Sequence, residues 1–153
     1  MSIVSAFPGG VGNKKRLFTE LILESRLWTC PDGVTSVNVR LFGGGGAGAS
    51  KNEYGGGGGG GGHMAYASLE VIPGVGYPVT IGAGGKNNGG TGESGGITSF
   101  GTLLSASGGS AATMANGNGG DGGSGGGGHN YASGNGGNGS YGGGGGGRHG
   151  GNG

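Results

Sequence analysis

The stretch T-S-V-N-V-R-L-F-G-G-G-G, residues 35–46, decides the fold of this chain. In its first part Val37, Val39 and Leu41 alternate with polar residues, and this period of two predicts a β-strand with one buried face. The strand runs directly into the glycines 43–46. This junction indicates that glycine is a building material here, on a scaffold set by a few conventional strands.

Glycine makes up 52 of the 153 residues and is concentrated in blocks such as 55–62 and 142–147. Collagen is excluded, because it needs glycine at every third position and abundant proline, and this chain has 4 prolines and all-glycine runs. A flexible linker is disfavoured, because the segments between the blocks have the pattern and apolarity of packed strands. The sequence therefore predicts an ordered protein with an unusually high glycine content.

Charge and hydropathy exclude several functional classes. The net charge is +1 and only 10% of residues are charged, which leaves no basic patch for nucleic acid. No apolar run approaches the roughly 18 residues that span a membrane, so no membrane insertion is expected. The start of the chain lacks the pattern of a secretory signal, and Cys30 has no second cysteine to pair with. We expect one domain that is synthesised in a cytoplasm, with no disulfide.

The conventional strands lie before residue 108, behind an N-terminal arm at 1–16. Residues 17–24 fit a strand with Leu17, Leu21 and Leu23 on one face, or a helix; the strand is preferred, because a helix would place three cations in its first turn. Ala65 to Val71 and Tyr77 to Ile81 alternate in the same way, with their odd-numbered residues on one face. The expected strands are residues 17–24, 27–30, 35–42, 65–72, 77–81, 97–100 and 102–106. They predict a small antiparallel β scaffold over residues 17–107, interrupted by glycine-rich excursions at 43–62 and 82–96.

From residue 108 onward the hydrophobic pattern disappears and a period of three takes its place. Non-glycine residues recur every third position at Asn118, Asp121 and Ser124, and again at Asn135, Asn138 and Tyr141. Three residues per turn is the geometry of polyproline II, and glycine rods in that conformation can hydrogen-bond to neighbours in several directions. The expected fold is therefore all-β, with a polyglycine II-like bundle over residues 108–153.

The ordered motifs of the scaffold resemble a known family. The stretch W-T-C-P-D-G-V-T-S-V-N-V (28–39), the tetrapeptide H-M-A-Y (63–66), the stretch Y-P-V-T-I-G (77–82) and the stretch G-G-I-T-S-F-G (95–101) are similar to the glycine-rich domain of bacteriophage tail proteins. The resemblance implies a virion component at a tail fibre or tail tip, assembled with other tail proteins or further copies of itself. Related adhesins present loops on a glycine bundle to a host receptor. A structural piece and a receptor-binding tip both fit the resemblance.

No constellation of catalytic, cofactor or metal-binding residues is found in the sequence. Chance G-x-G-x-x-G matches open no helix, and the three histidines lack metal-ligand spacing. We expect a non-enzymatic protein without cofactor or metal. Tyrosine, histidine and asparagine between glycine runs are the candidates for recognition of a host receptor or glycan, or for an interface: Tyr54, Asn87, Asn88, His129, Asn130, Tyr131 and Tyr141.

Two other functional classes remain as alternatives. A self-assembling extracellular filament could pair its strand edges and glycine rods between copies. An ice-binding protein could present a flat polyglycine II face, although outward Asn, Asp, Ser and Tyr suit ice less well than Thr or Ala.

Overall fold

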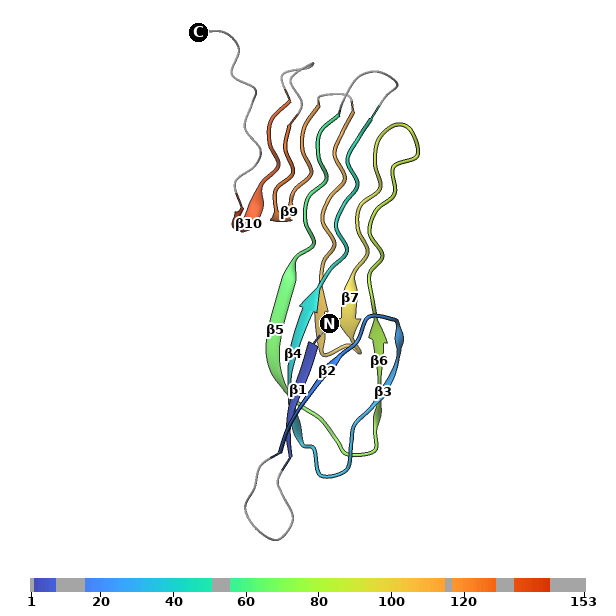
Figure 1. The fold of residues 1–153 in the computed structure, drawn as a ribbon, viewed down its shortest axis with the longest axis vertical. Coiled ribbons are helices and arrows are strands. Elements are labelled where there is room, and N and C mark those ends of the chain that lie inside the picture. Colours follow the sequence, from blue (N-terminus) through green and yellow to red (C-terminus); the bar gives the residue numbers. More distant parts are fainter. Residues whose placement is uncertain (1, 8–15, 51–55, 115–116, 129–133, 144–153) are drawn as a thin grey trace.

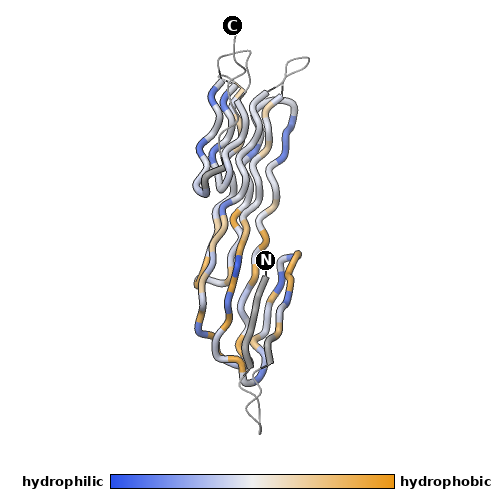
Figure 2. The backbone as a smooth tube through the Cα atoms, turned by 60° about the vertical axis from the view of Figure 1, so that its left-hand side comes forward, coloured by the Kyte–Doolittle hydropathy of each residue, from blue (hydrophilic) through white to orange (hydrophobic). Residues whose placement is uncertain are grey.

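The computed structural model describes residues 2–7, 16–50, 56–114, 117–128 and 134–143. The chain forms an elongated molecule in which a β sandwich occupies one half and side-by-side glycine segments occupy the other (Figure 1). Strands of the sandwich continue directly into the glycine segments, which we call rods. Hydrophobic residues gather in the sandwich half, whereas the rod half is mostly neutral in hydropathy with several hydrophilic segments (Figure 2).

The first sheet of the sandwich has the strand order β2-β1-β4-β5. Its strands are β1 (Ser2–Phe7), β2 (Arg16–Leu21), β4 (Ser36–Phe42) and β5 (Met64–Glu70). All neighbouring pairs in this sheet are antiparallel. Strand β4 is central: Val39 pairs with Ile3 of β1 on one side and with Ala67 of β5 on the other.

The second sheet has the strand order β3-β6-β7-β8 and is also antiparallel. Its strands are β3 (Arg26–Thr29), β6 (Gly76–Thr80), β7 (Thr98–Phe100) and β8 (Leu104–Ala106). The β7–β8 hairpin turns at Gly101. Its backbone φ is 53°, a value that residues with a side chain rarely adopt. The strands expected at residues 97–100 and 102–106 therefore form an antiparallel hairpin.

The core lies between the two sheets and is small. Val37, Val39 and Leu41 of β4 are all but inaccessible to solvent, as their alternation predicted. They face an aromatic cluster on the second sheet in which Tyr77 stacks on Phe100 at 5.2 Å between ring centroids. Trp28 packs against the same Phe100 at 5.6 Å. Apolar burial of this kind is the main favourable contribution to folding in this half of the molecule.

Two N-terminal details differ from the sequence analysis. Part of the expected arm forms β1, which inserts between β2 and β4. The strand over residues 17–24 ends at Leu21, and Leu21 and Leu23 are exposed, whereas Ile22 is buried. Leu21 is the last residue of β2, the outermost strand of its sheet, and Leu23 lies in the connection that follows. The chain instead turns Ile22 into the core at the β2–β3 connection.

The rods form a hydrogen-bonded bundle. In the rod of residues 43–50, the N–H groups of Gly43, Gly46 and Ala49 donate to carbonyls of the rod 57–63. The N–H groups one position later, of Gly44, Ala47 and Ser50, donate to the rod 90–96. Carbonyls of the same rod accept from Gly85 and from residues 109–112. These bonds repeat every three residues and reach several neighbours, whereas a β ladder repeats every two and reaches at most two strands.

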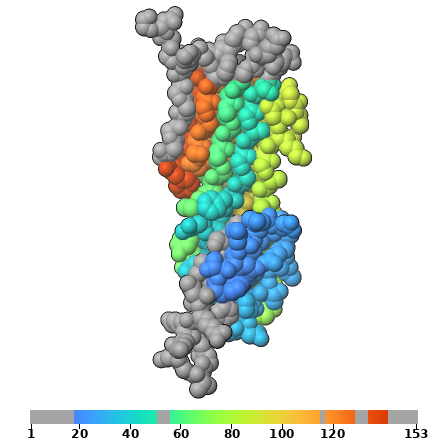
Figure 3. All heavy atoms as spheres, viewed as in Figure 1, coloured from blue at the N-terminus to red at the C-terminus, as the bar shows by residue number. Residues whose placement is uncertain are grey.

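Close backbone approach explains why these positions are glycine. A Cβ added at Gly46, Gly59 or Gly62 would come well within 3.0 Å of a carbonyl oxygen of a neighbouring rod. The space-filling view shows the rods packed against one another along the bundle (Figure 3). Glycine is therefore required here by packing between backbones.

The chain is all-β, with no helix among the described residues. The bundle is more extensive than the C-terminal region predicted for it, because the excursions at 43–62 and 82–96 supply rods that bond to those of residues 107–128. A short parallel pairing joins β9 (Gly122–Ser124) to β10 (Gly139–Gly143). The three-residue hydrogen-bond period supports a polyglycine II conformation, which itself stays a prediction.

Candidate functional site

The loop between two rods at residues 86–90 lies at the end of the bundle far from the sandwich (Figure 1). Its shape is set by Asn87, whose Nδ2 donates to the Gly48 carbonyl at 2.8 Å and to Ser50 Oγ at 3.1 Å. Its Oδ1 accepts from the N–H of Gly89 at 2.9 Å, and the φ of Gly89 is 81°. Asn88 bonds through Nδ2 to Glu93 at 3.0 Å. These contacts hold the loop in one shape against the adjoining rod.

Three of the seven predicted recognition residues lie in the described part of the chain, and they occupy two separate places. Asn87 and Asn88 lie in this distal loop, and much of their hydrogen-bonding capacity is used within the chain. Their role in recognition stays a prediction. The remaining loop candidates lie outside the described residues: Tyr54, His129, Asn130 and Tyr131.

Tyr141 lies away from the distal loop, on β10. Its hydroxyl donates to the carbonyl of Met64 at the start of β5, although 57% of the residue remains exposed. This bond ties the last described rod to the sandwich. Tyr141 therefore has a structural contact in addition to an exposed ring.

A polar groove lies on the flank of the bundle, and its residues are not among the predicted recognition residues. Its volume is about 510 Å³, and three neighbouring rods line it with residues 110, 111 and 113, 118–121 and 135–138. The side chains of Asn118 and Asp121 bridge two of these rods: their Oδ1 atoms accept the backbone N–H groups of Asn135 at 2.8 Å and Asn138 at 2.6 Å. The period of three was the sequence signal for this groove, because it places these side chains on one side of their rods.

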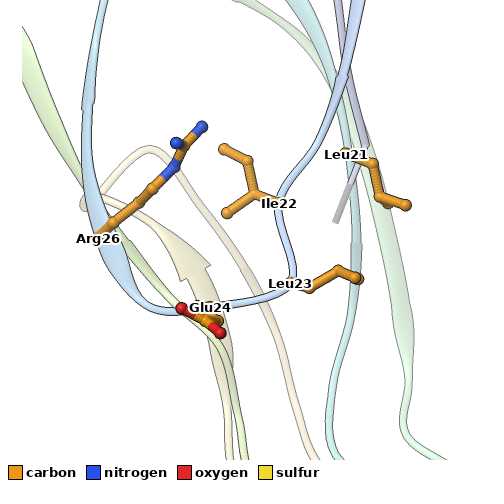
Figure 4. Close-up of a pocket in the computed structure, with 5 residues that line it drawn as sticks. All are labelled: Leu21, Ile22, Leu23, Glu24 and Arg26. Atoms are coloured by element: carbon orange, nitrogen blue, oxygen red, sulfur yellow. The ribbon is translucent and has the colours of Figure 1, made fainter.

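A second hollow, of about 250 Å³, lies at the β2–β3 connection. Ile22 and Arg26 point toward one another across it, while the exposed Leu21 and Leu23 point to the opposite side (Figure 4). Arg26 forms an ion pair with Glu20, which also accepts the indole N–H of Trp28 at 3.0 Å. The ion pair gives Arg26 a structural function at this hollow.

Cys30 is buried in the sandwich core, 1% exposed. Burial raises the pKa of its thiol, and the nearby Asp32 carboxylate raises it further. The thiol lies 3.3 Å from the carbonyl oxygen of Val34, to which it donates. A thiol held in its neutral form in this way is a poor nucleophile.

Within the described ranges, no group of three His, Cys, Asp or Glu side chains could hold a metal ion. The same ranges contain no helix long and apolar enough to cross a membrane.

The family model of the glycine-rich domain matches residues 23–153. The chain belongs to the glycine-rich domain family. No curated protein and no solved structure matches it. The matched region takes in both the sandwich strands from β3 onward and all the rods, whereas the β1–β2 hairpin precedes it. The glycine-rich domain is thus a sandwich and a bundle built by the same run of chain.

Proposed function

We propose that this glycine-rich domain is a non-enzymatic structural protein of a bacteriophage tail, located at a tail fibre or tail tip. In this proposal the protein is made in the host cytoplasm and becomes part of the virion. The sandwich attaches it to other tail proteins or to further copies, and the rod bundle carries loops toward a receptor on the host surface. The motifs of residues 28–39, 63–66, 77–82 and 95–101 support the assignment to tails.

The observation that carries the proposal is the placement of the loop 86–90 at the end of the bundle far from the sandwich (Figure 1). The hydrogen bond from Ser50 N–H to the Gly90 carbonyl, at 3.2 Å, brings the end of another rod to the same level. Recognition elements are commonly carried on loops that a rigid scaffold positions. An elongated support with loops at its free end suits a protein that reaches outward from a particle.

The construction of the bundle favours a mechanical function over chemistry. Each rod is bonded to several neighbours, so the load on one rod is shared across the bundle. In the loop 86–90, Asn87 bonds to the adjacent rod, and Asn88 bonds to Glu93 of the rod that follows the loop. Such an arrangement gives stiffness without an apolar core in that half of the molecule.

Immunogold electron microscopy tests the location. Antibodies raised against the purified chain are applied to phage particles released from the strain that encodes it, with antibodies against a capsid protein as the control. We expect gold particles at the distal end of the tail. Deletion of the gene is expected to leave particles that lack this label and adsorb poorly to host cells.

Absence of the chain from purified particles would overturn the assignment to tails. Filaments formed by the purified chain alone, together with that absence, would instead favour the self-assembling alternative.

A further inference from the structure

The groove on the flank of the bundle has a repeated polar lining. At one level Ser110, Asp121 and Asn138 lie side by side, because Ser110 N–H donates to the Asp121 carbonyl at 2.7 Å and Asn138 N–H donates to Asp121 Oδ1. The next level repeats this arrangement, with the Thr113 N–H bonded to the Asn118 carbonyl at 3.1 Å and the Asn135 N–H bonded to Asn118 Oδ1. Each level thus offers one hydroxyl, one central carboxylate or amide, and one further amide.

The two levels are three residues apart along each rod. An extended segment rises roughly 3.1–3.4 Å per residue, so the levels are about 9–10 Å apart. Two equivalent sets of polar groups at this separation suit an elongated ligand whose own polar groups repeat. The volume of about 510 Å³ lies in the range of small-molecule sites.

The bridging bonds also fix which atoms remain for a ligand. Asp121 and Asn118 each use Oδ1 to accept a backbone N–H of the neighbouring rod. No hydrogen bond recorded among the described residues uses Asp121 Oδ2 or Asn118 Nδ2. The groove therefore combines a carboxylate acceptor at one level with an amide donor at the other, both held by a fixed side chain.

We propose that this groove binds a neutral oligosaccharide. Sugar hydroxyls both donate and accept hydrogen bonds, so they match a lining that mixes carboxylate, amide and hydroxyl groups. Gly136 lines the groove and is partly exposed, and it carries no side chain that would hinder the approach of a sugar ring. The groove is separate from the distal loop, so this inference goes beyond the proposed tail function.

Other ligand classes fit the lining less well. Among the described residues that line the groove, Asp121 alone carries a charge, so its carboxylate would repel an anionic ligand. For a peptide, the described lining offers a single apolar side chain, that of Ala111. The N–H groups of Ser110, Thr113 and Gly119 already donate to carbonyls of neighbouring rods, so they are not available to pair with a peptide backbone. A single carboxylate is a sparse ligand set for calcium, which takes 6–8 oxygens.

The test begins with the full chain on an array of immobilised oligosaccharides from bacterial surface polysaccharides, neutral and acidic. Calorimetric titration with the best soluble ligand follows. Two substitutions keep the bridging Oδ1 and change only the groove-facing atom: Asp121→Asn converts an acceptor into a donor, and Asn118→Asp does the reverse. Asp32→Asn and Asn38→Asp, both at exposed positions outside the groove, are the controls for the same changes in charge.

We expect the wild-type chain to bind neutral oligosaccharides and each groove substitution to weaken binding about tenfold or more. The two controls should bind as the wild type does. If a groove substitution lowers the melting temperature, Ser110→Ala and Thr113→Val replace it, because they remove hydroxyls of the lining with little change in shape.

Several outcomes would overturn the inference: no oligosaccharide bound on the array, a preference for acidic ligands, or equal binding by groove and control variants. Calcium or peptide binding that depends on Asp121 without any saccharide binding would do the same. Binding by the purified chain and its presence on phage tails are separate measurements, so each proposal can fail alone.

Discussion

At the residue scale, two neighbouring rod glycines provide a test of backbone packing. A Cβ at Gly60 would fall well within 3.0 Å of the Asp121 carbonyl, whereas a Cβ at Gly45 would lie 3.7 Å from its nearest atom, the Gly60 carbonyl oxygen. We expect Gly60→Ala to lower the free energy of unfolding by about 1–3 kcal/mol or more, because rods must separate to admit the methyl group. Gly45→Ala should cost little. Thermal unfolding of both variants measures the difference, and equal melting temperatures would rule out close packing at Gly60.

A second residue-scale prediction concerns Cys30. Its pKa is raised in the folded protein, so the unfolded chain loses the thiol proton first as the pH rises. The contribution of the neutral thiol is fully present below the unfolded pKa of about 8.5 and is lost as the pH rises through the higher folded value. We expect the free energy of unfolding to fall more steeply above about pH 8.5 in the wild type than in Cys30→Ala, by at most about 1.4 kcal/mol per pH unit.

Denaturant titrations at pH 7, 8.5 and 9.5 measure this difference. Cys30→Ala will be offset to lower stability at every pH by the cavity it leaves. Parallel pH profiles for the two proteins would show that burial of Cys30 does not perturb its ionisation.

Side-chain burial was predictable from the sequence where a strand has a partner sheet. The alternating face of Val37, Val39 and Leu41 is buried, as expected, because β4 lies inside the sandwich. The leucine face of residues 17–24 was misleading, because periodicity reveals which residues share a face but not whether another layer covers it. The bonds of Asn87 to Gly48 and Ser50 join segments about 40 residues apart, and no local pattern indicates them.

At the scale of elements, the β1–β2 hairpin covers a strand edge. Strand β1 pairs with β4 from Ser2↔Arg40 to Ser5↔Val37, and the hairpin precedes the region matched by the family model. Deletion of residues 1–21 should leave the β4 edge open, and open edges pair readily with other chains. We expect the truncated protein to form dimers or larger species at concentrations where the full chain does not.

Size-exclusion chromatography with light scattering compares the two proteins over a concentration series. An unchanged mass distribution for the truncated chain, with a cooperative unfolding transition, would mean that the hairpin is not needed to protect β4.

Strands β2 to β8 of the scaffold were predicted to within a few residues, but β1 and the set of segments that form the bundle were not. Residues 43–50 and 57–63 lack the regular polar spacing of residues 118–124, so their glycine runs alone suggested excursions. Their place in the bundle follows from the strands they join: β4 leads directly into one rod, and the other leads directly into β5. Pairing β4 with β5 therefore brings the two rods together at the sheet, and the absence of side chains lets them remain in contact beyond it.

At the scale of the whole molecule, the two halves stabilise each other. A glycine rod loses much conformational entropy on ordering, and hydrogen bonds return only about 0.5–1.5 kcal/mol each. The sandwich holds the rod ends at fixed separations, which lowers the entropy cost of bringing the rods together. The rods in turn continue from paired strands and stay hydrogen-bonded to each other beyond the sheet. We therefore expect the sandwich and the bundle to unfold as one unit.

Calorimetry can test this coupling together with the unusual composition of the bundle. Unfolding typically increases the heat capacity by about 12–15 cal/mol/K per residue, or about 1.8–2.3 kcal/mol/K for a chain of 153 residues. That increase comes from exposure of apolar surface, and the bundle buries mainly peptide groups, whose exposure lowers the heat capacity. We expect a single transition with a heat-capacity increase clearly below 1.8 kcal/mol/K. Two separate transitions would contradict the coupling of sandwich and bundle, and an increase within the usual range would show that the bundle buries far more apolar surface than its hydrogen-bonded glycine backbones provide.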